Sequence, residues 1–181
     1  MKKLNKNGMT AIEVLICFSI VSIISVSMLK LVTSFKDKQE IESFKTSILT
    51  YKNTVTKAIT SDIIAGKGVN DVDVYDIISN GNGYTISATI KLNNGLNRSL
   101  KITQSNQAYS SGTSNSSKVT YNGKNYPMPK IPNLQFNGSD IRISENKFLI
   151  IQVGFNHPDL GNQFDAIKIK LPLSSEYNNV Y

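Results

Sequence analysis

Hydrophobic and polar positions follow three different patterns along the chain. The first is an apolar run over residues 9–29 that carries one charged side chain, Glu13. At about 1.5 Å rise per residue, a helix of this length spans roughly 30 Å, the thickness of a bilayer's hydrocarbon core. We therefore predict a transmembrane helix over residues 9–32.

The second pattern is a stripe of apolar residues at steps of three and four, with charged residues between them. Such spacing is typical of an amphipathic helix, and Gly66 and Gly68 after the stripe are helix stop signals. We predict that the helix continues over residues 33–66. The stripe consists of Ile41, Phe44, Ile48, Tyr51, Val55, Ile59 and Ile63.

The third pattern, over residues 69–181, is a series of short alternating runs split by turn residues. It predicts antiparallel strands, and Asn122-Gly123 is a strong hairpin signal. Residues 105–117 are predicted to form a polar loop. The predicted fold class is α+β, with a long N-terminal α-helix packed on an antiparallel β-sheet. The predicted strands lie at 72–78, 84–92, 98–104, 118–126 (the hairpin), 141–144, 147–155 and 164–171.

Composition describes a globular part joined to one apolar segment. Hydrophobic residues make up 40% of the 181 residues and charged residues 18%, so the chain is neither disordered by composition nor generally membrane-embedded. The formal net charge is +7, which by itself favours an anionic partner. Three of the 20 basic side chains lie in the first seven residues; without them, 17 face 13 acidic ones, a net charge of +4. That moderate charge weakens a nucleic-acid interpretation.

The position of Glu13 in the apolar run requires an explanation. A carboxylate at the centre of a bilayer costs about 2.5 to 3.5 kcal/mol on insertion scales, and less near the interface, so it usually has a partner. An ordinary secretory signal has a shorter apolar core and a small-residue cleavage site, which this run lacks. A plain signal anchor oriented by its lysines gives no role to Glu13. The serines of the run, Ser19, Ser22, Ser25 and Ser27, are tolerable because each hydroxyl can bond a backbone carbonyl one turn earlier.

Residues 1–32 resemble the type IV prepilin signature. A leader with three lysines precedes GMTAIE at residues 8–13 and an apolar helix, where the family usually has G-F-T-L-I-E. Met9 and Ala11 depart from the usual residues, but the glycine and the glutamate are kept. The resemblance implies that residues 1–8 are a leader, that a membrane peptidase cuts between Gly8 and Met9, and that the new N-terminus is methylated.

The resemblance also implies how such a chain works. After cleavage, the carboxylate of Glu13 in one subunit attracts the amine of Met9 in a neighbour, as an assembly contact without catalysis. The implied partners are other pilin subunits, the prepilin peptidase, an assembly ATPase and a platform protein. The chain is expected in the cell membrane, with its N-terminus cytoplasmic, and afterwards in a pilus at the cell surface.

Two features favour a minor pilin. No Pro or Gly lies between Gly8 and Gly66, where major pilins commonly carry a helix kink, and EVLICFSIVS at 13–22 is similar to the starts of minor pilins and pseudopilins. The presence of Glu13 argues against a tip subunit. A competence pseudopilin for DNA uptake and a type II secretion pseudopilin remain alternatives. A single-pass anchored binding module that does not polymerise is a further one.

Two groups of residues outside the helix are conceivable metal ligands. His157, with Asp159 nearby, could form a surface metal site, although a histidine before proline is more often a turn residue and these are too few ligands for a closed site. Asn70, Asp71, Asp73 and Asp76 form a loose oxygen cluster without the glycine and glutamate of an EF-hand. We expect Asp71 and Asp73 to line the wet face of a strand, and we predict no cofactor.

Other chemistry has little support. Cys17 has no basic neighbour in the sequence, so we expect it to pack in an apolar setting. No Ser/His/Asp arrangement, nucleotide-binding glycine loop or zinc spacing is present, and we predict no enzyme. Direct DNA contact is a minor alternative, because exposed lysines usually serve solubility. It rests on basic and aromatic residues that interleave around the hairpin, namely Lys118, Tyr121, Lys124, Tyr126 and Lys130.

Overall fold

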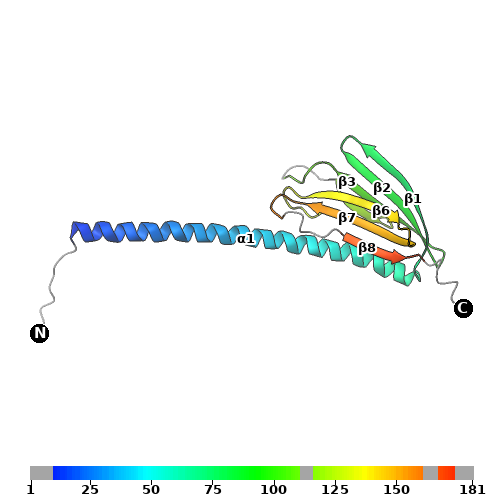
Figure 1. The fold of residues 1–181 in the computed structure, drawn as a ribbon, viewed down its shortest axis with the longest axis horizontal. Coiled ribbons are helices and arrows are strands. Elements are labelled where there is room, and N and C mark those ends of the chain that lie inside the picture. Colours follow the sequence, from blue (N-terminus) through cyan, green and yellow to red (C-terminus); the bar gives the residue numbers. More distant parts are fainter. Residues whose placement is uncertain (1–9, 111–115, 161–166, 174–181) are drawn as a thin grey trace, which may run out of the picture. The chain divides into compact units, whose positions relative to one another are not determined.

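The computed structural model describes residues 10–110, 116–160 and 167–173, without the side chains of Asp76 and Asn80. Residues 1–43 and 44–181 form two compact units. One helix and eight strands follow each other along the described chain (Figure 1). They are α1 (Ala11–Ala65), β1 (Val69–Asn80), β2 (Gly83–Leu92), β3 (Asn97–Ser105), β4 (Lys118–Tyr121), β5 (Lys124–Pro127), β6 (Gln135–Ile143), β7 (Phe148–Asn156) and β8 (Ile167–Pro172).

The second half of α1 buries four of the seven residues of the predicted stripe, and the other three, Ile41, Phe44 and Tyr51, are half-buried. Ile48, Val55, Ile59 and Ile63 are each at most 2% exposed, whereas Lys57 between them is exposed. This confirms the amphipathic prediction: side chains three and four residues apart share one helix face, and that face lies in the core.

Helix α1 ends at the two glycines, as predicted, and the chain turns out of the helix through positive φ at Lys67 and Gly68. The N–H of Gly68 donates to the carbonyl of Ile63 at 2.9 Å and that of Lys67 to Ile64 at 3.0 Å, which together form a Schellman motif. In this motif Lys67 is the residue directly after the C-cap, with φ of 63°, and Gly68 follows it with φ of 97°. Gly66 is needed for space, because a Cβ there would collide with the side chain of Leu92.

The strands form two sheets instead of the single sheet predicted. One contains five strands in the order β1-β2-β3-β4-β5, and the other three strands in the order β6-β7-β8. Neighbouring strands are antiparallel, which confirms the α+β prediction. Pro127, Pro129 and Pro132 lie between β5 and β6 or end β5, and residues without an N–H cannot continue a ladder. The chain therefore leaves the first sheet here and begins a second.

A turn and a register shift show how local sequence affects the strands. The β4–β5 hairpin has positive φ at Asn122 (47°) and Gly123 (80°), as the Asn-Gly signal predicted. Strand β6 begins at Gln135, six residues before the predicted start. A register shift between Asn137 and Asp140 interrupts the alternation there, and this hid the first part of β6 from a period-two pattern.

One core serves both sheets and the second half of α1. The Tyr51 hydroxyl donates to the carbonyl of Tyr126 on β5 at 2.9 Å, while its ring lies 6.3 Å from Phe136 on β6 and 6.0 Å from Phe155 on β7. Burial raises the pKa of Tyr51 above its ordinary value. On β8, Ile167 and Ile169 are buried, and Lys168 and Lys170 are exposed, which agrees with the alternating run over residues 164–171.

Candidate functional site

The first half of α1 exposes its apolar side chains. Residues 11–40 are all exposed within the structure. The helix is long and apolar enough to cross a membrane. Water is a poor solvent for such a continuous apolar surface, so this segment requires lipid or other apolar helices around it. Its large exposed residues include Ile12, Leu15, Phe18, Ile23, Met28 and Leu29.

Glu13 caps the N-terminus of its own helix. The backbone N–H of Thr10 donates to Glu13 Oε2 at 2.7 Å, and the N–H of Glu13 donates to Thr10 Oγ1 at 3.3 Å. These reciprocal bonds make a capping box, with Thr10 as N-cap and Glu13 three residues later. The Thr10 hydroxyl adds a third bond to Oε2 at 3.0 Å. The sequence prediction missed this structural role, although the signal T-x-x-E is present at residues 10–13.

The residues expected to form the processing site, Gly8 and Met9, lie outside the described residues. The cut between them and the contact between the Met9 amine and Glu13 therefore stay predictions. The capping box places the Glu13 carboxylate beside the backbone of Thr10, the residue that follows Met9 in the sequence. A carboxylate offers about four lone-pair sites, so the bonds from Thr10 leave room for a further donor.

The serines and the cysteine of the apolar run differ in whether they find partners within the same chain. The hydroxyls of Ser19, Ser22 and Ser27 donate to the carbonyls four residues earlier at 2.7 to 2.8 Å, as predicted. Cys17 is exposed, so the packing expected for it is not supplied within one chain.

His157 is not on the surface, which corrects the idea of a surface metal site. It is 3% exposed, and its ring lies 5.5 Å from that of Phe44. The N–H of Asp159 donates to Nδ1 at 3.2 Å, and Nε2 lies 2.8 Å from the carbonyl of Pro132. Nε2 therefore joins this loop to the loop of Pro132, and Nδ1 accepts a bond within its own loop. Asp159 contributes its backbone, and its carboxylate is not part of this arrangement.

Asp71 and Asp73 share a lysine. Lys91 Nζ lies 3.3 Å from Asp71 and 2.8 Å from Asp73, and Tyr75 donates to Asp73 at 3.2 Å. The hydrogen bond from Lys91 lowers the pKa of Asp73, and the same pairing raises the pKa of Lys91. Asp76 lies outside the described side chains. Among the residues that are described, no three His, Cys, Asp or Glu side chains are grouped so that they could hold a metal.

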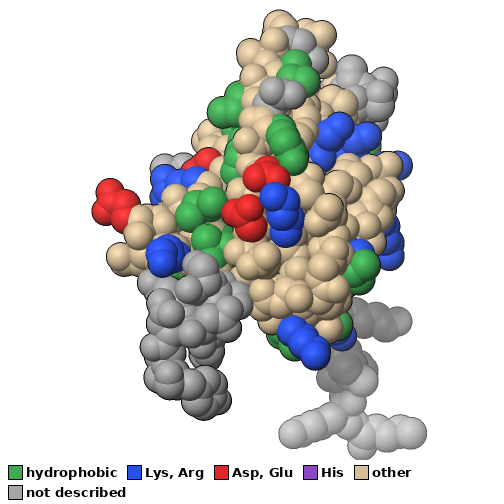
Figure 2. Space-filling model, turned by 90° about the vertical axis from the view of Figure 1, so that its right-hand side faces the viewer, with side chains coloured by type: hydrophobic (Ala, Val, Ile, Leu, Met, Phe, Trp, Pro, Cys, Tyr) green, Lys and Arg blue, Asp and Glu red, His purple; other side chains and the backbone are tan. Residues whose placement is uncertain are grey.

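This exposed ion-pair group confirms that Asp71 and Asp73 line the wet face of a strand. Figure 2 shows acidic and basic side chains in contact on the face of the molecule that it presents, with hydrophobic side chains beside them. The two carboxylates already have an ammonium group as counter-ion.

The interleaved hairpin residues do not form one surface, which corrects the basis of the DNA hypothesis. Tyr121 is 3% exposed, and its hydroxyl donates to Asp62 at 2.9 Å, so its ring cannot stack on a base. Burial and the bond to Asp62 raise the pKa of Tyr121. Lys124 lies over the ring of Tyr126 at 5.4 Å. Lys118 alternates with buried Val119 along β4, so it points to the opposite sheet face from Tyr121.

Asp62 joins the end of α1 to the five-stranded sheet. Its carboxylate accepts bonds from Arg98 on β3 at 2.6 and 3.1 Å, besides the bond from Tyr121 on β4. The hydrogen bonds from Arg98 hold the pKa of Asp62 below its usual range. Arg98 and Tyr121 lie 36 and 59 positions after Asp62, so no local sequence pattern could predict these contacts.

Comparison with known proteins gives no family for this chain. No protein-family model matches it, and neither a curated protein nor a solved structure is significantly similar to it. The function has to be argued from the residues themselves.

Proposed function

We propose that this protein is a minor pilin, a structural subunit that enters a type IV pilus filament after residues 1–8 are removed. The observation that carries the proposal is the exposed apolar run of α1 up to Leu29, in which Glu13 is the one charged side chain. An α+β arrangement of one long N-terminal helix with antiparallel sheets is compatible with it.

The exposed helix needs two successive apolar environments in such a function. Lipid covers it while the subunit waits in the membrane, and the helices of neighbouring subunits cover it in the filament. Both environments have a low dielectric constant, in which an unpaired carboxylate is costly. A helix bundle therefore favours the register in which Glu13 meets a positive group, and the amine created at Met9 is the nearest candidate in the sequence.

The capping box prepares Glu13 for this role. Because Thr10 holds the carboxylate through Oε2, the group is fixed beside the helix start before any neighbour arrives. A fixed acceptor loses less side-chain entropy when an amine binds. A buried charge of this kind is best attested as a device that specifies register.

The proposal includes the implied partners and locations. The precursor is a single-pass membrane protein with a cytoplasmic N-terminus, the prepilin peptidase processes it, and the assembly ATPase and platform protein extend the filament from other pilin subunits. A competence or type II secretion pseudopilin would use the same helix and carboxylate. Purified pili that contain this protein favour the pilus, whereas its presence only in a short envelope-spanning filament favours a pseudopilin.

Mass spectrometry of the chain in purified filaments tests the processing step. We expect a mature protein that begins at Met9 and carries one additional methyl group. Gly8→Leu should leave the precursor uncut, because the peptidase of this family requires a glycine before the cut. Asn7→Ala, one residue away, is the matched control and should be processed normally. A mature chain that begins elsewhere, or a Gly8→Leu protein that is cut between residues 8 and 9, would overturn the proposal.

A further inference from the structure

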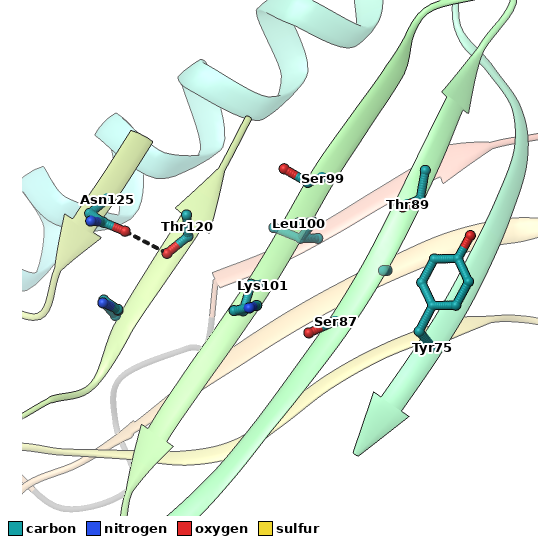
Figure 3. Close-up of a pocket in the computed structure, with 10 residues that line it drawn as sticks. Tyr75, Ser87, Thr89, Ser99, Leu100, Lys101, Thr120 and Asn125 are labelled. Carbon is teal, nitrogen blue, oxygen red and sulfur yellow. Dashed lines mark hydrogen bonds between the residues drawn. The ribbon is translucent and has the colours of Figure 1, made fainter. Parts of the chain in front are cut away.

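The five-stranded sheet has a hollow on the face opposite its buried one. The hollow has a volume of about 410 Å³, and its lining residues belong to strands β1 to β5 (Figure 3). We call it the outer hollow. Its lining consists of Tyr75, Ser87, Ala88, Thr89, Ser99, Leu100, Lys101, Lys118, Thr120 and Asn125.

Strand register places two lysines side by side in the outer hollow. Lys101 on β3 lies opposite Thr120 on β4, and Lys118 lies two residues before Thr120 on the same strand. The two lysines are therefore diagonal neighbours on one sheet face, with Cα atoms about 7 to 8 Å apart. Lys101 is exposed and Lys118 is half-buried.

The charge of this pair is not neutralised within the described part of the chain. None of the ion pairs found among the described residues involves Lys101 or Lys118, and the lining of the hollow contains no carboxylate. Lys91, on the same sheet face, is different, because Asp71 and Asp73 both pair with it. Like charges on neighbouring strands repel each other, so an anion between Lys101 and Lys118 would stabilise the sheet.

The remaining lining supplies neutral hydrogen-bonding groups. Ser87, Thr89 and Ser99 present hydroxyls, which both donate and accept. The hydroxyl of Thr120 donates to Asn125 Oδ1 at 2.7 Å, which orients the amide and leaves its NH₂ group as a donor (Figure 3). This mixture suits a ligand that carries many hydroxyl groups.

One aromatic ring lies at the β1 end of the outer hollow. Tyr75 follows a register shift on β1, where two residues oppose one residue of β2 between the pairs Val74–Ala88 and Ile77–Ile86. Tyr75 is 56% exposed, and its hydroxyl donates to Asp73 at 3.2 Å. A flat, exposed ring beside hydroxyl groups can cover the apolar face of a sugar ring.

We propose that the outer hollow binds an acidic polysaccharide. Lys101 and Lys118 contact its carboxylate groups, the hydroxyl and amide groups bind the sugar hydroxyls, and Tyr75 packs on a sugar ring. Single-stranded nucleic acid fits less well, because such sites stack successive bases on several aromatic side chains and the lining of the hollow supplies one. The inference does not depend on filament assembly, since every lining residue belongs to the unit of residues 44–181.

Binding measurements on the whole chain in detergent micelles test this. The probes are polygalacturonate, which carries a carboxylate on each sugar, neutral dextran and single-stranded oligothymidylate, each at low and at physiological salt. We expect polygalacturonate to bind most tightly, with binding weakened by salt. Lys101→Gln/Lys118→Gln should weaken it at least about tenfold, since two charge-assisted contacts are lost. Tyr75→Ala should weaken it by about fivefold, the order of magnitude of one ring contact.

The matched control removes two charges elsewhere. Lys130 and Lys168 are exposed and do not line the hollow, so Lys130→Gln/Lys168→Gln should bind polygalacturonate like the original chain. Near-ultraviolet circular dichroism checks that both double variants are folded. The proposal is overturned if the control loses as much affinity as the hollow variant, if dextran or oligothymidylate binds more tightly than polygalacturonate, or if polygalacturonate does not bind.

Discussion

The two halves of α1 have opposite surroundings although they belong to one helix. Residues 11–40 are exposed on every side, whereas Ile48, Val55, Ile59 and Ile63 are buried in the core of the globular unit. The first half is apolar all round up to Leu29, apart from Glu13, and the second half is apolar on one face only. A helix that is apolar all round requires an apolar environment on all sides, and one apolar stripe is satisfied by a single packed face. The apolar face of the second half is therefore covered within the chain, whereas the apolar surface of the first half is not.

The largest expected effect concerns Glu13 and separates its two roles. Gln can replace Glu in a capping box, so Glu13→Gln keeps the cap and removes the charge, whereas Glu13→Ala removes both. We expect both variants to lower the amount of this protein in sheared filaments by at least about tenfold, because a buried amine without its counter-charge costs several kcal/mol. Quantitative immunoblotting of filament and membrane fractions measures this.

Glu40→Gln is the matched control, since Glu40 is also an exposed carboxylate on α1. It should enter filaments at the normal level. Normal incorporation of Glu13→Gln together with failure of Glu13→Ala would show that capping, and not charge, is what assembly needs.

The same substitution in the two halves should have different consequences for folding. Ile59 is fully buried, and Ile59→Ala should lower the free energy of unfolding by about 2 to 5 kcal/mol. Ile24 is 52% exposed, so Ile24→Ala should change it by less than about 0.5 kcal/mol. Denaturation in detergent micelles, followed through the tyrosine signal of a chain with 8 Tyr and no Trp, measures both. Equal losses of unfolding free energy would contradict the conclusion that only the second half of α1 packs within the chain.

The Asp62 contacts give the globular unit a pH dependence. Arg98 lowers the pKa of Asp62 in the folded chain, so the folded state binds this proton less readily than the unfolded state. The contribution is complete above the unfolded pKa, about 3.9, and is lost as the pH falls through the lower folded pKa. Asp62→Asn should lower the free energy of unfolding by about 1 to 2 kcal/mol at pH 7.

Comparison of the two proteins from pH 7 down to pH 3 checks this sign. The difference in unfolding free energy between the original chain and Asp62→Asn should shrink as the pH falls. A difference that stays constant with pH would mean that the ionised carboxylate of Asp62 does not contribute.

The smallest effect is expected at the end of α1. Lys67 has φ of 63°, a conformation that costs a non-glycine residue roughly 1 kcal/mol. Lys67→Gly should therefore stabilise the globular unit by up to about 1 kcal/mol, because glycine adopts this conformation freely. Lys57→Gly, in the exposed interior of the helix, should instead destabilise it by about 1 kcal/mol. Chemical denaturation of the two variants should shift in opposite directions, and shifts of the same sign would contradict this account.

Local patterns predicted most of the elements. The stripe to Ile63, the Asn122-Gly123 turn and the alternation on β8 each correspond to what the structure contains. These are effects of neighbours within a few residues, where period and turn chemistry decide. The start of β6 was missed because a register shift near Gly138 breaks the period.

The candidate sites were less predictable. The T-x-x-E signal could have identified the capping box of Glu13, because it lies within four residues. The outer hollow could not be read in the same way, since Lys101 and Lys118 become neighbours through the pairing of β3 with β4. Tyr121 looked like a surface aromatic and is buried against Asp62.

The sequence by itself determined the apolar first half of α1, the place of Glu13 in it, the amphipathic second half and the alternating strands, because each is a property of residues close together in the chain. Only the tertiary structure decided that the strands form two sheets on one helix, that Asp62 meets Arg98 and Tyr121, and that His157 is buried between two loops. Those outcomes depend on which distant segments pack in the same core. The total packing energy of the whole unit determines this, and no local pattern contains it.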